Sequence, residues 1–264
     1  MQPMSLHTFL RGPPAYQSSL GPKLYVAAPI AILLFLVGQL GAGLAYFALG
    51  FDPSALYASA NVTPGVGTPP SANAITPAQL LIVLMSQVFT VALTLAAALA
   101  APGGVTQALR LGPPDGGNRA YLWAAIVMVP LLAVLNAAAY LLTPGDFLAD
   151  FRQFLGAVRG NWPVVAALAI GVGAPLSEEL LFRGYLLTSA TATRIPFWPA
   201  AILVNAAWTA LHIQYSIVGI SEVFVIGLYL SWVTWRTGSL RVPLFCHALY
   251  NSSLFLIMRF LPIG

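Results

Sequence analysis

Long apolar runs separated by short polar segments dominate the pattern of this sequence. A helix needs about 20 predominantly apolar residues to cross the hydrocarbon core of a bilayer. The pattern predicts an all-α fold, a polytopic transmembrane bundle of about seven to eight spanning helices. Seven candidates are visible, at 25–49, 78–101, 120–143, 163–187, 197–218, 222–236 and 240–261. The sixth is short, and we expect its helix to begin earlier.

Two further segments have patterns of their own. The segment 51–77 is rich in Pro, Gly, Ser and Ala and is typical of a loop. It contains Asn61-Val62-Thr63, which fits the Asn-x-Thr glycosylation pattern, but nothing else indicates a glycosylating compartment. Residues 146–158 place apolar and charged side chains at helical spacing, which predicts a helix lying on the membrane surface.

The basic residues between the apolar runs indicate an orientation in the membrane, because cytoplasmic loops are enriched in Lys and Arg. With a cytoplasmic N-terminus, the inside segments hold Arg11, Lys23, Arg110, Arg119, Arg194, Arg236 and Arg241. The outside segments then hold Arg152, Arg159 and Arg259. We therefore expect a cytoplasmic N-terminal tail at 1–24 and a single transmembrane bundle at 25–264.

The composition supports an integral, multi-pass membrane protein. Hydrophobic residues make up 59% of the chain and charged residues only 7%, whereas a soluble domain carries about 25% charged residues. The net charge of +4 does not indicate nucleic acid as a partner, since the 11 basic residues are scattered. One cysteine, Cys246, excludes an internal disulfide.

Ionisable and polar side chains within the apolar runs are candidates for function, because they are costly in a membrane. The set is Glu178, Glu179, Arg183, Trp208, His212, His247 and Asn251. Glu179 and Arg183 are four residues apart, so they can pair along one helix face. Glu178 projects about 100° away from Glu179, which leaves it free to face another helix.

The spacing also predicts that these side chains share one depth. Glu178 and His212 lie at equal distances on either side of Ile195, where the chain is expected to turn. With a rise of about 1.5 Å per residue, the following helices bring His247 back to a similar level. Asn251 follows His247 by four residues and faces the same side of its helix. Polar groups from three helices are therefore expected to converge.

Small residues and a proline shape the stretch that precedes Glu178. Gly171 and Gly173 are expected to allow close approach of another helix. Pro175 lacks a backbone N–H, which is expected to free the carbonyl of Gly171 and to give water a point of entry. The same helix is therefore predicted to be irregular near its carboxylates.

Glutamate and histidine together can activate water as a general base and then protonate a leaving amine. Imidazole and carboxamide donors can stabilise an oxyanion, and one donor in a dry site is worth about 3–4 kcal/mol. These residue types therefore suit hydrolysis of a peptide bond. The motifs Glu-Glu-x-x-x-Arg, aromatic-x-x-x-His and His-x-x-x-Asn follow one another along the chain.

This ordered set resembles the CAAX prenyl endopeptidase and bacteriocin-processing (CPBP) family of intramembrane proteases, over a protease core at about 160–255. The resemblance implies that Glu178 and His212 activate water. It also implies that His247 and Asn251 form the oxyanion hole.

Three further residues are interpreted as supporting ones: Glu179, Arg183 and Trp208. Pairing with Arg183 is the expected fate of Glu179. Where the family usually has Phe, four residues before the first motif histidine, this chain has Trp208. We expect that bulkier ring to change packing more than chemistry.

Zinc is an alternative to a metal-free mechanism. Glu178, His212 and His247 with one water would provide the ligand number of a catalytic zinc site. The sequence lacks the His-Glu-x-x-His pattern, and Asn251 is a better oxyanion donor than zinc ligand. No cofactor is therefore favoured, with zinc kept as the alternative.

The sequence thus predicts a CAAX-type intramembrane endopeptidase acting on a membrane-associated protein or peptide. A prenylated C-terminal peptide is one substrate class, and a leader peptide or sorting tail is another. The lipid bilayer is the other expected partner. The competing hypothesis is a non-proteolytic membrane protein, either an immunity or scaffold factor or a transporter that uses the same residues as a proton or ion path.

Overall fold

The computed structural model describes residues 4–17, 22–52, 54, 75–145 and 148–261, which contain helices and turns but no strand. The predicted loop at 51–77 and its Asn61-Val62-Thr63 pattern lie almost entirely outside these residues. In chain order the helices are α1 (Leu6–Arg11), α2 (Leu24–Ala48), α3 (Pro77–Leu99), α4 (Gly104–Ala108), α5 (Asn118–Leu142), α6 (Ala149–Arg159), α7 (Pro163–Ala167), η2 (Leu168–Gly173), α8 (Ala174–Glu178), η3 (Glu179–Leu186), α9 (Leu187–Ala192), α10 (Phe197–Ala210), α11 (Ile217–Thr237) and α12 (Arg241–Phe260).

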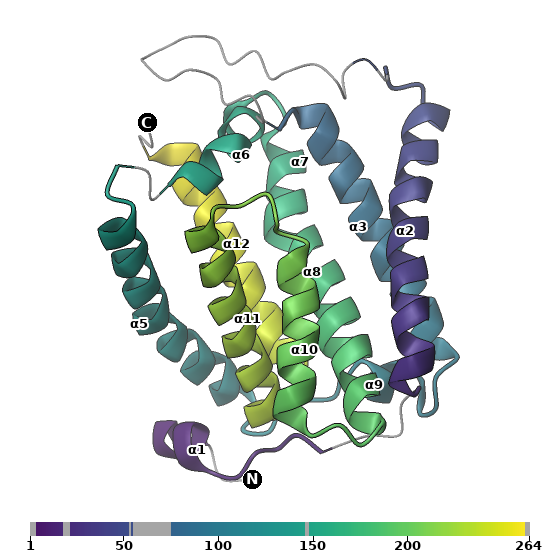
Figure 1. Ribbon diagram of the computed structural model, residues 1–264, viewed down its shortest axis with the longest axis vertical. Coiled ribbons are helices and arrows are strands. Elements are labelled where there is room, and N and C mark those ends of the chain that lie inside the picture. The colour runs from purple at the N-terminus through teal and green to yellow at the C-terminus, as the bar shows by residue number, and fades with distance from the viewer. Residues whose placement is uncertain (1–3, 18–21, 53, 55–74, 146–147, 262–264) are drawn as a thin grey trace.

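Seven helical passes, counted over the described residues, run between the two ends of the bundle (Figure 1). Five of these helices are long and apolar enough to cross a membrane: Leu24–Ala48, Ala78–Leu99, Asn118–Leu142, Pro163–Ala192 and Ile217–Thr237. The other two are α10, with 14 residues, and α12, with 20. The prediction of an all-α polytopic bundle is therefore confirmed.

The fifth and sixth predicted helices have different bounds from those expected. The fifth ends at Ala210 rather than at 218, and the sixth begins at Ile217, earlier than 222 as anticipated. Ser216 explains the early start, because its side chain accepts a hydrogen bond from the Gly219 N–H and caps α11. The residues between the two helices form a turn.

The fourth span, Pro163–Ala192, is a single helix of 30 residues assembled from α7, η2, α8, η3 and α9. Its stretches η2 and η3 are wound as π-helix, with hydrogen bonds between residues five apart. Such windings are frequent at functional sites. The predicted irregularity before Glu178 thus takes the form of π winding.

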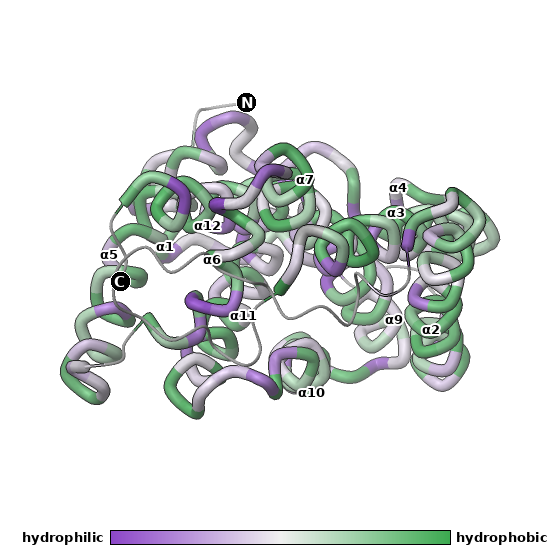
Figure 2. Tube along the Cα trace, turned by 90° about the horizontal axis from the view of Figure 1, so that it is seen from above, coloured by the Kyte–Doolittle hydropathy of each residue, from purple (hydrophilic) through white to green (hydrophobic). Residues whose placement is uncertain are grey.

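Apolar side chains cover the outer surface of the bundle. On α2, Ile32, Leu36, Leu40 and Leu44 are each more than half exposed. Figure 2 shows α2 at the periphery, hydrophobic over most of its length. An exposed apolar surface of this extent suits lipid rather than water.

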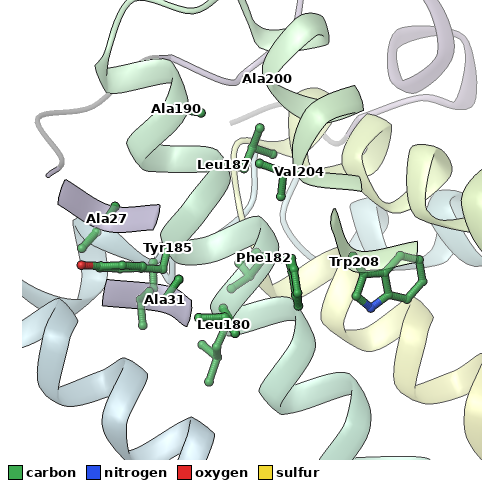
Figure 3. Close-up of a cluster of buried hydrophobic side chains, with 14 of the residues drawn as sticks. Ala27, Ala31, Leu180, Phe182, Tyr185, Leu187, Ala190, Ala200, Val204 and Trp208 are labelled. Carbon is green, nitrogen blue, oxygen red and sulfur yellow. The ribbon is translucent and has the colours of Figure 1, made fainter. Parts of the chain in front are cut away.

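Small residues let the helices pack closely inside the bundle, as they do in membrane proteins generally. Ala27 and Ala31 of α2 belong to one buried cluster with Tyr185 of η3 (Figure 3). The predicted role of two glycines is confirmed. A Cβ atom would lie 2.8 Å from Ser252 Oγ at Gly171 and 2.1 Å from Gln87 Oε1 at Gly173.

The predicted surface helix is α6, although residues 146 and 147 lie outside the described part of the chain. Its apolar side packs on the bundle, where Phe151 and Phe154 join a buried cluster with Leu80. This apolar face is therefore taken up by protein, and the position of α6 at the membrane surface stays a prediction. Asp150 further ties α6 to the turn after α10, accepting 2.7 Å bonds from the Ser216 N–H and hydroxyl.

Hydrogen bonds join the turns at the end of the bundle that carries α1. The Lys23 ammonium donates to Ala192 O at 2.7 Å, and the Leu240 N–H donates to Arg110 O at 2.9 Å. Buried Arg236 donates to the carbonyls of Thr8, Phe9 and Gly12. Lys23, Arg110 and Arg236, which were predicted to lie on the cytoplasmic side, are thus on segments joined by hydrogen bonds at this end of the bundle. The orientation of this end in the membrane stays a prediction.

Candidate active site

A cavity of about 440 Å³ lies within the bundle, between α3, α6, α8 and the helices α10 to α12. Glu178, His212, His247 and Asn251 all lie on its wall. The structure therefore brings together the four side chains whose convergence was predicted from spacing. Their catalytic roles stay a prediction at this point.

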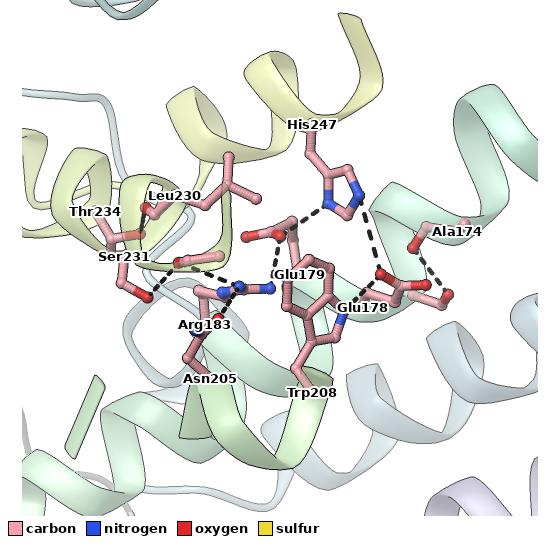
Figure 4. Close-up of polar contacts among 12 residues, drawn as sticks. Ala174, Glu178, Glu179, Arg183, Asn205, Trp208, Leu230, Ser231, Thr234 and His247 are labelled. Atoms are coloured by element: carbon pink, nitrogen blue, oxygen red, sulfur yellow. Dashed lines mark hydrogen bonds and ion pairs between the residues drawn. The ribbon is translucent and has the colours of Figure 1, made fainter. Parts of the chain in front are cut away.

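Glu179 and Arg183 form a buried ion pair, as their spacing predicted. The Arg183 Nη1 donates to Glu179 Oε1 at 3.0 Å, and both residues are fully buried (Figure 4). The second carboxylate oxygen, Oε2, has no partner among the described residues. Removing one partner of such a pair strands a charge in a dry environment.

Two residues that the sequence reading did not single out complete the surroundings of Arg183. Its Nη2 donates to Asn205 Oδ1 at 3.1 Å and to Gly227 O at 3.3 Å. A Cβ atom at Gly227 would lie 1.8 Å from Asn205 Oδ1 and 2.7 Å from Arg183 Nη2. Only glycine leaves room for the guanidinium there. Asn205 could have been singled out from the sequence, because an amide within an apolar helix commonly hydrogen-bonds to another helix.

His247 is held by the same carboxylate. Its Nδ1 lies 3.0 Å from Glu179 Oε1, and its Nε2 lies 3.9 Å from Glu178 Oε2. The shared oxygen of Glu179 already accepts from Arg183 and can only accept, so Nδ1 carries a proton. Glu179 therefore fixes the ring of His247 so that Nε2 is directed toward Glu178 and the cavity.

Glu178 has a different partner from Glu179. The indole Nε1–H of Trp208 donates to Glu178 Oε2 at 2.6 Å (Figure 4). The side chain of Glu178 keeps 22% exposure toward the cavity, whereas that of Glu179 has none. Glu178 thus faces another helix, as predicted. Trp208 therefore does more than fill space, because phenylalanine could not make this bond.

His212 lies in the turn that follows α10, one residue beyond its C-cap Leu211. Its Nδ1 contacts the Trp208 carbonyl at 3.2 Å. A carbonyl only accepts hydrogen bonds, so Nδ1 is the protonated nitrogen. In the neutral tautomer that fits this contact, Nε2 is the acceptor nitrogen. The rings of His212 and His247 lie 5.2 and 5.8 Å from that of Trp208, measured between centroids.

Asn251 contacts the irregular part of the fourth span. Its Nδ2 donates to Ile170 O at 3.0 Å. In the π winding, the Ala174 N–H donates to Ala169 O, so the next donor in register would be residue 175. Pro175 has no N–H, which leaves Ile170 O free for Asn251. The freed carbonyl predicted at Gly171 is thus found one residue earlier, because the pattern is i to i+5.

Two further carboxylates line the cavity and were not singled out from the sequence. Glu222 of α11 and Asp150 of α6 are both part of its wall. A glutamate inside a long apolar helix was a sufficient signal for Glu222. Asp150 gave no such signal, because it lies on an amphipathic segment.

Zinc stays an untested alternative at this site. Within the described ranges, no group of three or more His, Cys, Asp or Glu side chains could hold a metal ion. We therefore derive no chemical step through a metal.

Comparison with known proteins identifies the region of the site. Residues 160–253 match the family described as "Type II CAAX prenyl endopeptidase Rce1-like". An Escherichia coli protein described as "Uncharacterized 24.3 kDa protein" is 33% identical over 86 residues, which is 32% of this chain and 40% of that protein. The chain thus spans less than half the length of this relative. No solved structure matches the chain.

The buried ion pair between Glu179 and Arg183 is expected to contribute to stability. Arg183→Leu leaves Glu179 charged and buried without its cation, so we expect a loss of about 3–5 kcal/mol in the free energy of unfolding. Arg183→Leu combined with Glu179→Leu removes both charges and should recover part of that loss. Denaturant unfolding of the purified variants in detergent measures both. Equal losses in the single and double variants would contradict the ion-pair interpretation.

Zinc content and sensitivity to a chelator test whether the protein depends on a metal. We expect purified active protein to contain far less than one zinc per chain by elemental analysis, and cleavage to continue after exposure to a chelator. Stoichiometric zinc that leaves together with activity, and returns it when added back, would overturn the metal-free assignment.

Proposed function

We propose that this multi-pass membrane protein is an intramembrane endopeptidase, a proposal supported by the match of residues 160–253 to the Rce1-like type II CAAX prenyl endopeptidase family. It hydrolyses a peptide bond in a membrane-associated protein or peptide. One observation carries the proposal. Of two adjacent carboxylates, Glu179 is neutralised by Arg183 while Glu178 faces a cavity that also contains two imidazoles.

Glu178 is the proposed general base. Trp208 holds its Oε2, and no donor contacts Oε1 among the described residues, so Oε1 is the atom left for a water molecule. This carboxylate takes a proton from water as the oxygen attacks the carbonyl carbon of the substrate. The proton then passes to the leaving amine as the carbon–nitrogen bond breaks.

His212 is proposed to assist the same proton transfer. The Trp208 carbonyl holds its Nδ1–H, which leaves Nε2 as the acceptor of a residue that lines the cavity. A neutral imidazole in this tautomer can accept a proton from water and return it to nitrogen. Its position in a turn after α10 sets this nitrogen at the edge of the cavity.

His247 and Asn251 are the proposed oxyanion donors. His247 already gives its Nδ1–H to Glu179, so it donates to substrate through Nε2 only when both ring nitrogens are protonated. The Glu179 carboxylate faces the charge of that form. Asn251 uses one of its two amide N–H bonds on Ile170 O, and the second is available for the substrate oxygen.

Replacing the proposed base and its partner tests the assignment. Glu178→Ala and His212→Ala should each abolish cleavage of a membrane peptide substrate while the protein still inserts into membranes. Glu222→Gln is a matched control, because Glu222 is a carboxylate of the same cavity to which the mechanism gives no role. We expect it to retain cleavage. The readout is product formed per inserted protein in membranes.

Full cleavage by either alanine variant would refute the proposed mechanism. Loss of a transport or immunity phenotype in the Glu178→Ala variant, with wild-type protein that cleaves no membrane peptide, would favour the non-proteolytic hypothesis instead.

A further inference from the structure

The tryptophan at position 208 lies at the centre of the candidate active site. Its ring contacts four groups: the Glu178 carboxylate, the Arg183 guanidinium and the two imidazoles. The Arg183 Cζ lies 4.2 Å from the ring centroid, over its face. Trp208 itself is only 3% exposed. Its position is therefore fixed by packing on all sides.

The indole contacts both Glu178 and the partner of Glu179, Arg183. The face of the ring covers Arg183, and the ring nitrogen donates to Glu178 at 2.6 Å. Arg183 is thus kept on the side of Glu179, where it makes its ion pair. A guanidinium has donors enough to reach a second carboxylate, and contact with Glu178 would neutralise the proposed base.

The hydrogen bond also orients the carboxylate. Because Trp208 engages Oε2, rotation about the last bond of the Glu178 side chain is restricted, and Oε1 stays the oxygen without a protein donor among the described residues. Hydrogen bonds to charged groups are stronger than those between neutral groups. A single fixed donor of this kind holds a base within the narrow geometry that catalysis needs.

We propose that Trp208 is a positioning residue for Glu178, through its indole N–H, and a barrier between Glu178 and Arg183, through its ring. This inference rests on the proposed protease function. It differs from the role expected from sequence, where the ring was treated as a packing substitution for phenylalanine.

The variant Trp208→Phe separates the two roles, because it keeps an aromatic ring over Arg183 and removes only the donor. We expect its kcat to fall about 10- to 100-fold, the range for loss of a hydrogen bond to a charged group, with KM nearly unchanged. An unchanged KM together with a lowered kcat indicates an effect on the chemical step. Trp208→Leu removes the barrier as well and should lose more activity than Trp208→Phe.

Trp123→Phe is the matched control. The Trp123 Nε1–H of α5 donates to Met4 O at 2.9 Å, and Trp123 is not one of the residues that line the cavity. It removes an indole donor from the same protein without touching the site, so kcat should stay at the wild-type value. A wild-type kcat in Trp208→Phe, or an equal loss in Trp123→Phe, would overturn the inference.

A spectroscopic measurement tests the contact without relying on cleavage. The chain has six tryptophans, and the indole N–H resonance lost in Trp208→Phe identifies that of Trp208 in nitrogen-labelled protein. Glu178→Gln should move this resonance upfield, because a neutral acceptor replaces a charged one. A resonance that does not move would contradict the hydrogen bond.

Experiments can distinguish a failure of the proposed protease function from a failure of the role assigned to Trp208. Wild-type protein that cleaves no membrane peptide would refute the proposed function and with it the positioning role. Wild-type cleavage that depends on Glu178 but not on the indole N–H would refute the role of Trp208 alone.

Discussion

One arginine for two adjacent carboxylates is the constraint on which the rest of this site depends. A charge inside a membrane protein is costly unless it is paired or reaches water. Arg183 makes its ion pair with Glu179 and donates to Asn205 and the carbonyl of Gly227. Glu178 therefore has to be accommodated by other means, and the structure provides an indole donor and a cavity. That shortage of cations is what leaves a carboxylate available for chemistry.

The irregular winding of the fourth span serves the same arrangement. The π stretches η2 and η3 flank the short α8 that ends at Glu178. In η2, the missing N–H of Pro175 leaves Ile170 O without a backbone donor. The side chain of Asn251 on α12 donates to this carbonyl instead. A backbone defect thereby attaches the helix that carries His247 and Asn251 to the helix that carries the carboxylates. The same helix pair then closes one wall of the cavity.

Much of this could be predicted from the sequence, for physical reasons that differ between features. Apolar run length gave the spans, because the bilayer fixes how many residues a helix needs. A four-residue spacing predicted the pairing of Glu179 with Arg183, and equal distances from Ile195 predicted the shared depth of Glu178 and His212. Each of these depends only on regular helix geometry.

The rest depended on departures from regular geometry or on contacts between distant segments. The freed carbonyl was displaced from Gly171 to Ile170, since α-helical spacing does not hold in a π winding. Gly227 leaves space for a guanidinium that arrives from another helix, which no local pattern indicates. The donor role of Trp208 required knowing which way its ring points.

The central claim is a division of labour between neighbours: one carboxylate holds the fold and the imidazole, and the other acts on water. The most direct measurement compares Glu178→Gln with Glu179→Gln for both unfolding free energy and cleavage rate in the same detergent and membrane preparations. Glu178→Gln should lose cleavage with its stability within about 1 kcal/mol of wild type, since the amide oxygen still accepts from Trp208. Glu179→Gln should be clearly less stable, because Arg183 then lacks a counter-charge. Cleavage that survives in Glu178→Gln, or a Glu179→Gln variant as stable as wild type, would contradict the account.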